Sequence, residues 1–262
     1  MHGLSAIDPG RHVDWGKASA DYAQFRPGPP PSFYARLAAL GVGLCGQRIL
    51  DLGTGTGVLA REFARRGAVT AGIDISDEQI ATARRLAAAE GVTVDFRRAG
   101  AESAPFADHA FDCLTANQCW LYFDKSQALR EARRLLVPGG VLVTSHFSWL
   151  PRLDPIARAS EALILAHNPQ WSAGDWAGEI PPMPTWAEAD LRLRAMFWYD
   201  EPIAFTRETW RGRIRANRGI GATLSAAEVA VFDAEHDQLL RQIAPERFTI
   251  LHRLDAHIFA FK

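Results

Sequence analysis

The stretch Ile49-Leu50-Asp51-Leu52-Gly53-Thr54-Gly55-Thr56-Gly57 decides the fold that the rest of the sequence supports. Its apolar first half predicts a short buried strand over 48–52. Three glycines at alternate positions follow, and they permit backbone conformations and ligand approaches that other residues forbid. The apolar spacing over 58–66 predicts a helix that Gly67 ends. We therefore expect a strand, a glycine-rich bend and a helix whose free N–H groups face that bend.

Strands and helices alternate on both sides of this stretch. Residues 31–40 predict a helix before it. After it, the pattern predicts strands at 69–74, 92–97, 111–116 and 141–145, with helices at 77–90 and 125–136. Such alternation indicates parallel strand pairing, because each crossover helix returns the chain to the same edge of the sheet. We therefore predict a doubly wound α/β fold.

The other segments are interpreted as parts of one domain that spans residues 1–262. We expect an N-terminal arm over 1–31, a ligand-binding core over 32–146, a tryptophan-rich, partly helical insertion over 147–195, and terminal strands and helices over 196–262. Within the last part, the pattern predicts a strand at 197–205, helices at 206–218 and 225–243, and strand material at 248–251 and 257–261. Trp120 and the insertion's tryptophans at 149, 171, 176 and 186 either cover an apolar acceptor as a lid or fill the core beneath the insertion.

Composition excludes several function classes. The 262 residues carry a formal net charge of −1, whereas a nucleic-acid binder usually has a basic surplus, so we expect no nucleic-acid partner. We expect no membrane span and no signal peptide, because no apolar run is long enough and the N-terminus lacks the charged-then-apolar pattern. The cysteines at 45, 113 and 119 form no C-x-x-C pair, which predicts no metal site and a reducing cytoplasm. Monomer and homodimer both stay open.

Two carboxylates flank the glycine bend and indicate its ligand. Asp74 ends the next predicted strand, about 20 residues after Gly53, where a carboxylate can accept both ribose hydroxyls of a nucleoside. Asp51 lies just before the bend, where it would attract an ammonium group and repel a pyrophosphate. This favours S-adenosylmethionine over a dinucleotide. Residues 55–60 nevertheless fit G-x-G-x-x-A, so an NAD(P)-dependent oxidoreductase is one alternative, and a non-catalytic S-adenosylmethionine-binding module is another.

An ordered set of motifs resembles the class I S-adenosylmethionine-dependent methyltransferases of the type 11 group. The set consists of 49–57, Gly72 to Ser76, Ala101 to Phe106, the segments at 111–112, 117–120 and 123–124, and Leu135 to Gly140. The resemblance covers about residues 48–146 in the right order, which is more specific than any single motif. It implies a seven-stranded, mostly parallel sheet with an antiparallel edge strand near the C-terminus. It also implies methyl transfer to a small-molecule acceptor.

The resemblance assigns residues to the methionine end of the donor. Asp51 would hold its amino group, directly or through water, and the bend would line the methionine moiety. The residues of the bend concerned are Gly53, Thr54, Gly55 and Gly57. Tyr22 to Pro27 resembles an arm that folds over this end in the family. Arg26 would pair with the donor carboxylate, since a guanidinium can bind it through two hydrogen bonds, and Tyr22 would lie nearby.

The adenosine end is assigned in the same way. Asp74 would hold the ribose, Ile75 would pack on the adenine, and Ala101 would offer a backbone contact with Glu102 beside it. The residues expected under the sulfonium are Asn117 and Gln118. Many relatives carry Gly-Asp before Ala-Glu, and that aspartate binds the adenine amine. Here Ala99 and Gly100 stand instead, so we expect adenine binding to depend more on stacking.

Candidates for catalysis and acceptor binding are fewer. A general base is needed only where the acceptor keeps its proton near neutral pH. His146, just after the predicted strand 141–145, is the candidate base, and a structural histidine is the alternative. Trp120, Trp149 and Arg211 are candidates for acceptor contacts, although an arginine late in a helix also complements the helix dipole.

Overall fold

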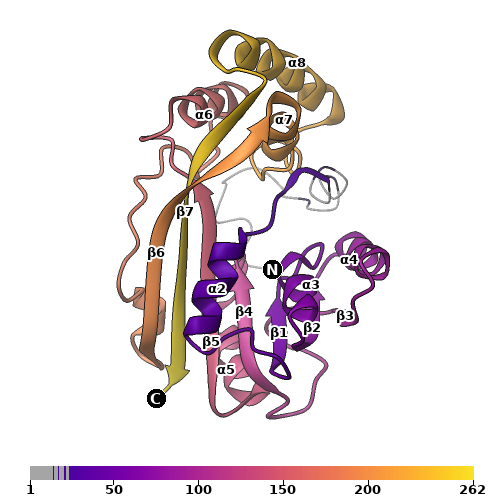
Figure 1. The fold of residues 1–262 in the computed structure, drawn as a ribbon, viewed down its shortest axis with the longest axis vertical. Coiled ribbons are helices and arrows are strands. Elements are labelled where there is room, and N and C mark those ends of the chain that lie inside the picture. The colour runs from indigo at the N-terminus through magenta and orange to yellow at the C-terminus, as the bar shows by residue number, and fades with distance from the viewer. Residues whose placement is uncertain (1–13, 15–16, 18–20, 22–23) are drawn as a thin grey trace. The chain divides into compact units, whose positions relative to one another are not determined.

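The computed structural model describes Asp14, Lys17, Asp21 and residues 24–262. Its centre is a seven-stranded sheet in the order β3-β2-β1-β4-β5-β7-β6 (Figure 1). The strands are β1 (Arg48–Leu52), β2 (Val69–Asp74), β3 (Val94–Arg98), β4 (Phe111–Asn117), β5 (Leu136–Trp149), β6 (Leu191–Thr206) and β7 (Arg247–Phe261). The helices are α2 (Pro31–Ala39), α3 (Val58–Arg65), α4 (Asp77–Ala89), α5 (Lys125–Leu135), α6 (Pro155–His167), α7 (Arg207–Arg215) and α8 (Ala226–Ile243), with 3-10 turns η2 (Trp120–Tyr122) and η3 (Thr185–Ala187).

The predicted α/β class with a doubly wound, mostly parallel sheet is confirmed. Strand β1 pairs in parallel with β2 and β4, β2 with β3, and β4 with β5. The antiparallel strand is β7, which lies between β5 and β6 rather than at the edge (Figure 1). The central strands are apolar almost throughout because helices cover both faces of such a sheet.

Three strands are longer than the sequence pattern indicated. β5 begins at Leu136 because its Pro138-Gly139-Gly140 segment is accommodated as a register shift opposite β4, with Gly139 at φ 81°. β6 begins at Leu191, inside the expected insertion. The two C-terminal strand fragments form one continuous strand, β7. Long-range pairing with neighbouring strands thus outweighs the local turn signals.

The chain divides into two compact units. The core unit comprises residues 28–147, 180–198 and 254–262, and the accessory unit comprises 1–27, 148–179 and 199–253. In the accessory unit, α8 packs against both α6 and α7 (Figure 1). The expected insertion at 147–195 is shared between the two units. The assignment of the whole chain to one domain stays a prediction.

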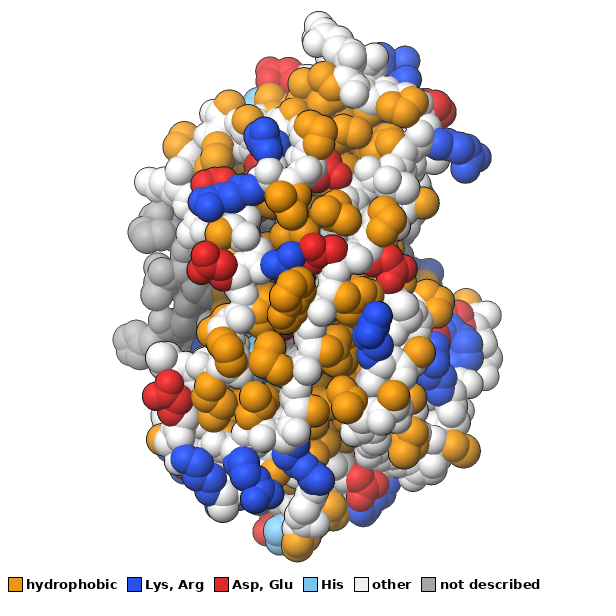
Figure 2. All heavy atoms as spheres, turned by 60° about the vertical axis from the view of Figure 1, so that its left-hand side comes forward, with side chains coloured by type: hydrophobic (Ala, Val, Ile, Leu, Met, Phe, Trp, Pro, Cys, Tyr) orange, Lys and Arg blue, Asp and Glu red, His pale blue; other side chains and the backbone are white. Residues whose placement is uncertain are grey.

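The surface mixes side chains of all kinds. On the face shown in Figure 2, the described residues place basic and acidic side chains among hydrophobic ones. Trp198 on β6 is among the large hydrophobic side chains that are more than half exposed. Within residues 24–262 and the three described positions before them, no helix is both long and apolar enough to cross a membrane.

Candidate functional site

The glycine-rich bend lies between the carboxyl end of β1 and the start of α3. Gly53, Gly55 and Gly57 all have positive φ, between 55° and 78°. A Cβ at Gly53 would lie 2.9 Å from the Cβ of Cys119, so a side chain there would be both strained and crowded. Helix α3 starts at the last of these glycines without a side-chain cap, which leaves its N-terminal N–H groups for another acceptor. The bend is therefore shaped to bring backbone close to a ligand.

Asp51 is buried beneath this bend and is held by two hydroxyl groups. Thr54 Oγ1 donates to Asp51 Oδ2 at 2.7 Å, and Thr115 Oγ1 donates to Asp51 Oδ1 at 2.6 Å. Only 3% of Asp51 is exposed, and no described lysine, arginine or histidine forms an ion pair with it. Burial raises the pKa of Asp51 to about 6, against the lowering effect of the two hydroxyl hydrogen bonds. Asp51 thus supplies negative charge close to the bend.

Asp74 ends β2 and ties the bend to this strand. Gly55 N donates to Asp74 Oδ2 and Ser76 N donates to Oδ1, both at 3.0 Å. Burial raises the pKa of Asp74 above its ordinary value, while the N–H groups of Ser76 and Gly55 oppose that rise. A carboxylate oxygen can accept more than one hydrogen bond, so Asp74 keeps capacity for ribose hydroxyls.

The residues expected at the adenine lie beside Asp74. Ile75 is 58% exposed, so its side chain is accessible for stacking. A Cβ at Gly100 would lie 4.0 Å from Ile75 Cγ2 and 3.0 Å from Glu102 Oε2, which shows that these three residues are neighbours. Asp124 N donates to Glu102 Oε1 at 2.9 Å, and Ala101 is buried. The structure therefore gathers the predicted adenosine-end residues around one strand end.

Asn117 ends β4 and Gln118 follows it, and both are hydrogen-bonded to β5. Ser145 Oγ donates to Asn117 Oδ1 at 3.1 Å, and Gln118 N donates to Ser145 O at 2.9 Å. Gln118 Nε2 donates to Phe147 O at 2.7 Å, and Gln118 has a positive φ of 57°. A non-glycine residue in this conformation is uncommon and indicates that the surroundings enforce it.

His146 lies between the two β5 residues that hold this segment. Its Nδ1 is 3.0 Å from Oδ2 of Asp255 on β7, and its side chain is 42% exposed. Asp255 is fully buried, and its Oδ1 has no hydrogen-bond partner among the described residues. His257 Nδ1 lies 3.9 Å from Asp255 Oδ2, while His257 Nε2 donates to Pro181 O at 2.9 Å. The candidate base is therefore paired with a buried carboxylate that the sequence analysis did not single out.

The two candidate acceptor tryptophans are both buried. In the core unit, Trp120 packs against Trp186 with ring centroids 4.8 Å apart. In the accessory unit, Trp149 meets Trp210 edge to face, and its Nε1 donates to Glu161 at 2.5 Å. Both side chains thus belong to hydrophobic cores, as the core interpretation expected, and a role toward an acceptor stays a prediction.

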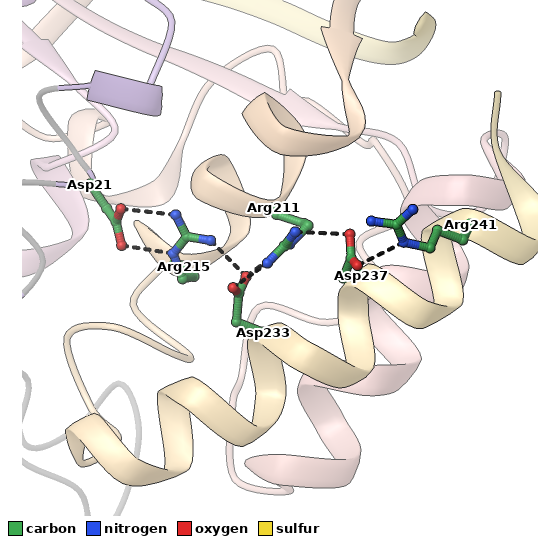
Figure 3. A network of polar contacts seen from close by, with 6 residues as sticks. All are labelled: Asp21, Arg211, Arg215, Asp233, Asp237 and Arg241. Carbon is green, nitrogen blue, oxygen red and sulfur yellow. Dashed lines mark hydrogen bonds and ion pairs between the residues drawn. The ribbon is translucent and has the colours of Figure 1, made fainter. Parts of the chain in front are cut away.

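Arg211, the third acceptor candidate, is part of an ionic network in the accessory unit (Figure 3). It binds Asp233 at 2.5 Å and Asp237 at 2.8 Å. Arg215 bridges Asp233 and Asp21 at 2.6 and 3.0 Å. An anionic acceptor would compete with two carboxylates for Arg211, so its role in acceptor binding stays a prediction.

The arm predicted to cover the methionine end is only partly described. Tyr22 lies outside the described residues. Arg26 belongs to the accessory unit, whereas the bend belongs to the core unit. Their contacts with the donor stay predictions.

Two residues of the site were not anticipated. Thr115 is opposite Asp51 in the β1–β4 register, but pattern analysis predicts strands and not their register. Asp255 had a usable signal: it is the one carboxylate within the otherwise apolar Leu254-Asp255-Ala256 stretch of a strand. A charged residue at a core position is expected to be paired or functional.

Comparison with known proteins adds to this geometry. Residues 50–144 match the family model described as a methyltransferase domain. The chain is 40% identical over 124 residues to the ubiquinone/menaquinone biosynthesis C-methyltransferase UbiE of Serratia proteamaculans, over 45% of this chain and 49% of that protein. It is 36% identical over 159 residues to the ubiquinone biosynthesis O-methyltransferase of Alkalilimnicola ehrlichii, over 59% of this chain and 64% of that protein.

Solved structures show the same fold. YjhP of E. coli superposes with a TM-score of 0.55 at 22% identity, over 94% of this chain and 99% of that one. The chain spans about half the length of the UbiE relatives that it matches, so their activities are not transferred to it directly. The family model covers the segment that holds the bend, Asp51, Asp74 and Asn117.

Proposed function

We propose that this protein transfers a methyl group from S-adenosylmethionine to a small-molecule acceptor, because residues 50–144 match the methyltransferase domain model. The observation that carries the proposal is the pair of carboxylates at the glycine bend, Asp51 and Asp74, neither of which has a cationic partner among the described residues. A positively charged donor would supply that partner, whereas a pyrophosphate would be repelled.

The residues present fit the donor. The positive-φ glycines leave room for the methionine moiety, and Asp51 places negative charge behind them. Asp74 would accept the ribose hydroxyls, and the exposed Ile75 would pack on the adenine. When bound, S-adenosylmethionine supplies a methyl group already activated by the sulfonium. The protein then acts chiefly by holding the two reactants in line and excluding water.

The relatives do not fix the acceptor atom. One is named a C-methyltransferase and the other an O-methyltransferase. We propose that residues outside that segment select the acceptor, and Trp149 and Arg211 of the accessory unit stay candidates for that role. Arg26 and Tyr22 are proposed to close over the donor carboxylate.

The test compares two ligands on the purified protein. Isothermal titration calorimetry should show binding of S-adenosylhomocysteine and no binding of NADH. Radiolabelled S-adenosylmethionine with a panel of phenolic, amine and carbon-acid acceptors should then transfer label to at least one. NADH binding without S-adenosylhomocysteine binding would establish an oxidoreductase instead. Donor binding with no transfer to any acceptor would establish a binding module.

The cellular setting follows from the same proposal. We propose that the protein works in the cytoplasm as a monomer or homodimer, without a nucleic-acid partner or a metal ion. Sedimentation velocity of the purified protein would give its oligomeric state, and gel-shift assays with duplex DNA and RNA should show no complex.

A further inference from the structure

The contact between His146 and Asp255 has the geometry of an oriented general base. Asp255 has no exposed surface, and its Oδ2 lies 3.0 Å from His146 Nδ1. A carboxylate at this distance holds the proton on Nδ1, and a neutral imidazole with that proton has its lone pair on Nε2. No described residue forms a hydrogen bond or ion pair at Nε2, and the His146 side chain is 42% exposed. The nitrogen able to accept a proton is thus left available.

His146 lies on β5 between two residues that contact the end of β4. His146 follows Ser145, which is opposite Asn117 in the β4–β5 register and bonded to it. It precedes Phe147, whose carbonyl accepts from Gln118. The sequence neighbours of His146 on β5 therefore hold Asn117 and Gln118, the two residues predicted to lie under the sulfonium.

The rest of the surroundings agree with this tautomer. His257 also faces Asp255, with its Nδ1 at 3.9 Å, beyond hydrogen-bond distance. Because Pro181 O can only accept, His257 must carry a proton on Nε2. A neutral His257 then has no proton on Nδ1 to offer Asp255. His146 is accordingly the ring that satisfies the carboxylate.

We propose that His146 Nε2 is the general base of the methyl transfer and that Asp255 is its positioning residue, which makes the acceptor a group that must lose a proton, such as a hydroxyl or a carbon acid. This rests on the proposed function. The acceptor atom forms its bond to the methyl carbon, the methyl–sulfur bond breaks with its electron pair going to sulfur, and the acceptor proton moves to Nε2. The imidazolium formed is stabilised by the Asp255 carboxylate and returns the proton to water.

The first experiment reads the tautomer directly and requires no acceptor. Long-range ¹H–¹⁵N NMR spectra of the full chain over a pH series should show that the neutral form of His146 carries its proton on Nδ1 and none on Nε2. His146→Gln identifies the signals by their loss. Asp255→Asn should abolish the fixed tautomer of His146. His109, whose Nδ1 donates to Leu136 O at 2.7 Å, is an internal control that should keep its own Nδ1–H pattern in every variant. A wild-type His146 with its proton on Nε2, or an unchanged pattern in Asp255→Asn, would overturn the proposal.

The second experiment separates this proposal from the proposed function. Both Asp255→Asn and His146→Gln should bind S-adenosylhomocysteine as tightly as wild type, within about twofold. With an acceptor from the screen, both should lower kcat by about a hundredfold or more, the range for loss of a general base, with little change in KM. Asp255→Glu should recover part of the loss. Full kcat in both variants would show that His146 is not the general base, and the proposed methyl transfer would still stand. Failure of the wild-type protein to bind S-adenosylhomocysteine would instead contradict the proposed function itself.

Discussion

Two groups of aspartates, one in each unit, differ in their charged partners. In the core unit, Asp51, Asp74 and Asp255 are wholly or partly buried, and among the described residues none has a lysine or arginine partner. In the accessory unit, three aspartates share three arginines. These are Asp21, Asp233 and Asp237 with Arg211, Arg215 and Arg241 (Figure 3).

The difference separates carboxylates that are available to bind a ligand from carboxylates that stabilise the fold through ion pairs. A buried carboxylate without a counter-ion costs free energy of folding, and such groups are enriched at functional sites. A carboxylate that shares arginines is compensated within the chain and needs no ligand. This contrast supports the donor and base functions proposed for the core-unit aspartates and indicates a structural role for the network.

The largest expected effect is at Asp74. Asp74→Ala removes the charged acceptor proposed for two ribose hydroxyls, and hydrogen bonds to charged groups contribute about 1.5–3 kcal/mol each. We expect affinity for S-adenosylhomocysteine to fall by at least about a hundredfold in calorimetry. Asp77→Ala is the matched control, because Asp77 is close in sequence but its side chain is 70% exposed. Equal affinity in wild type and Asp74→Ala would show that the ribose binds elsewhere.

The sequence predicted the parts of this comparison that are local. The bend at 49–57 and the strand ending at Asp74 were predicted correctly because hydrophobic runs, glycines and caps act over a few residues. The helix predicted at 225–243 formed as α8, which begins with a capping box between Ser225 and Glu228.

The parts that depend on register could not be predicted. Asp51 and Thr115 are 64 positions apart, and His146 and Asp255 are 109 apart. Which residues meet across a sheet depends on strand order and on shifts such as the one in β5, and neither is encoded locally. The same limit applies to Arg211, whose partners Asp233 and Asp237 lie on another helix.

The second prediction concerns Asp51 and the pH dependence of stability. Burial raises the pKa of Asp51 from 3.8 to about 6, so the folded protein holds this proton more tightly than the unfolded chain does. The contribution of Asp51 to the free energy of unfolding therefore falls as pH rises from about 4 to about 6. Relative to wild type, Asp51→Asn should gain about 1–3 kcal/mol across that interval and then stay level.

Denaturant unfolding at a series of pH values measures this difference. Because both proteins share every other titrating group, subtraction isolates Asp51. The same variant should bind S-adenosylhomocysteine more weakly, since it lacks the negative charge behind the bend. A stability difference that does not vary with pH would show that Asp51 titrates normally and would weaken the contrast between the units.

The smallest effect, with the opposite sign, is expected in the accessory unit. Burial alone would raise the pKa of Asp233, but hydrogen bonds from Arg211 and Arg215 outweigh burial and lower it. The stability that Asp233 contributes is therefore present above about pH 4 and is lost as pH falls through its lowered pKa. Asp233→Asn should lower the free energy of unfolding by about 1 kcal/mol at neutral pH, and this difference should shrink in acid.

Arg211→Gln tests the same network by removing one of its arginines instead of one of its aspartates. It should cost a similar amount of stability and leave S-adenosylhomocysteine affinity unchanged, and the acceptor KM decides between a structural role and acceptor binding. Arg152→Gln is the control, since Arg152 pairs with Asp175 on the surface with side chains 55% and 72% exposed, where an ion pair contributes about 0–1 kcal/mol. A raised acceptor KM in Arg211→Gln without a loss of stability would make Arg211 a ligand-binding residue. Compensated charge in the accessory unit would then no longer indicate a purely structural role.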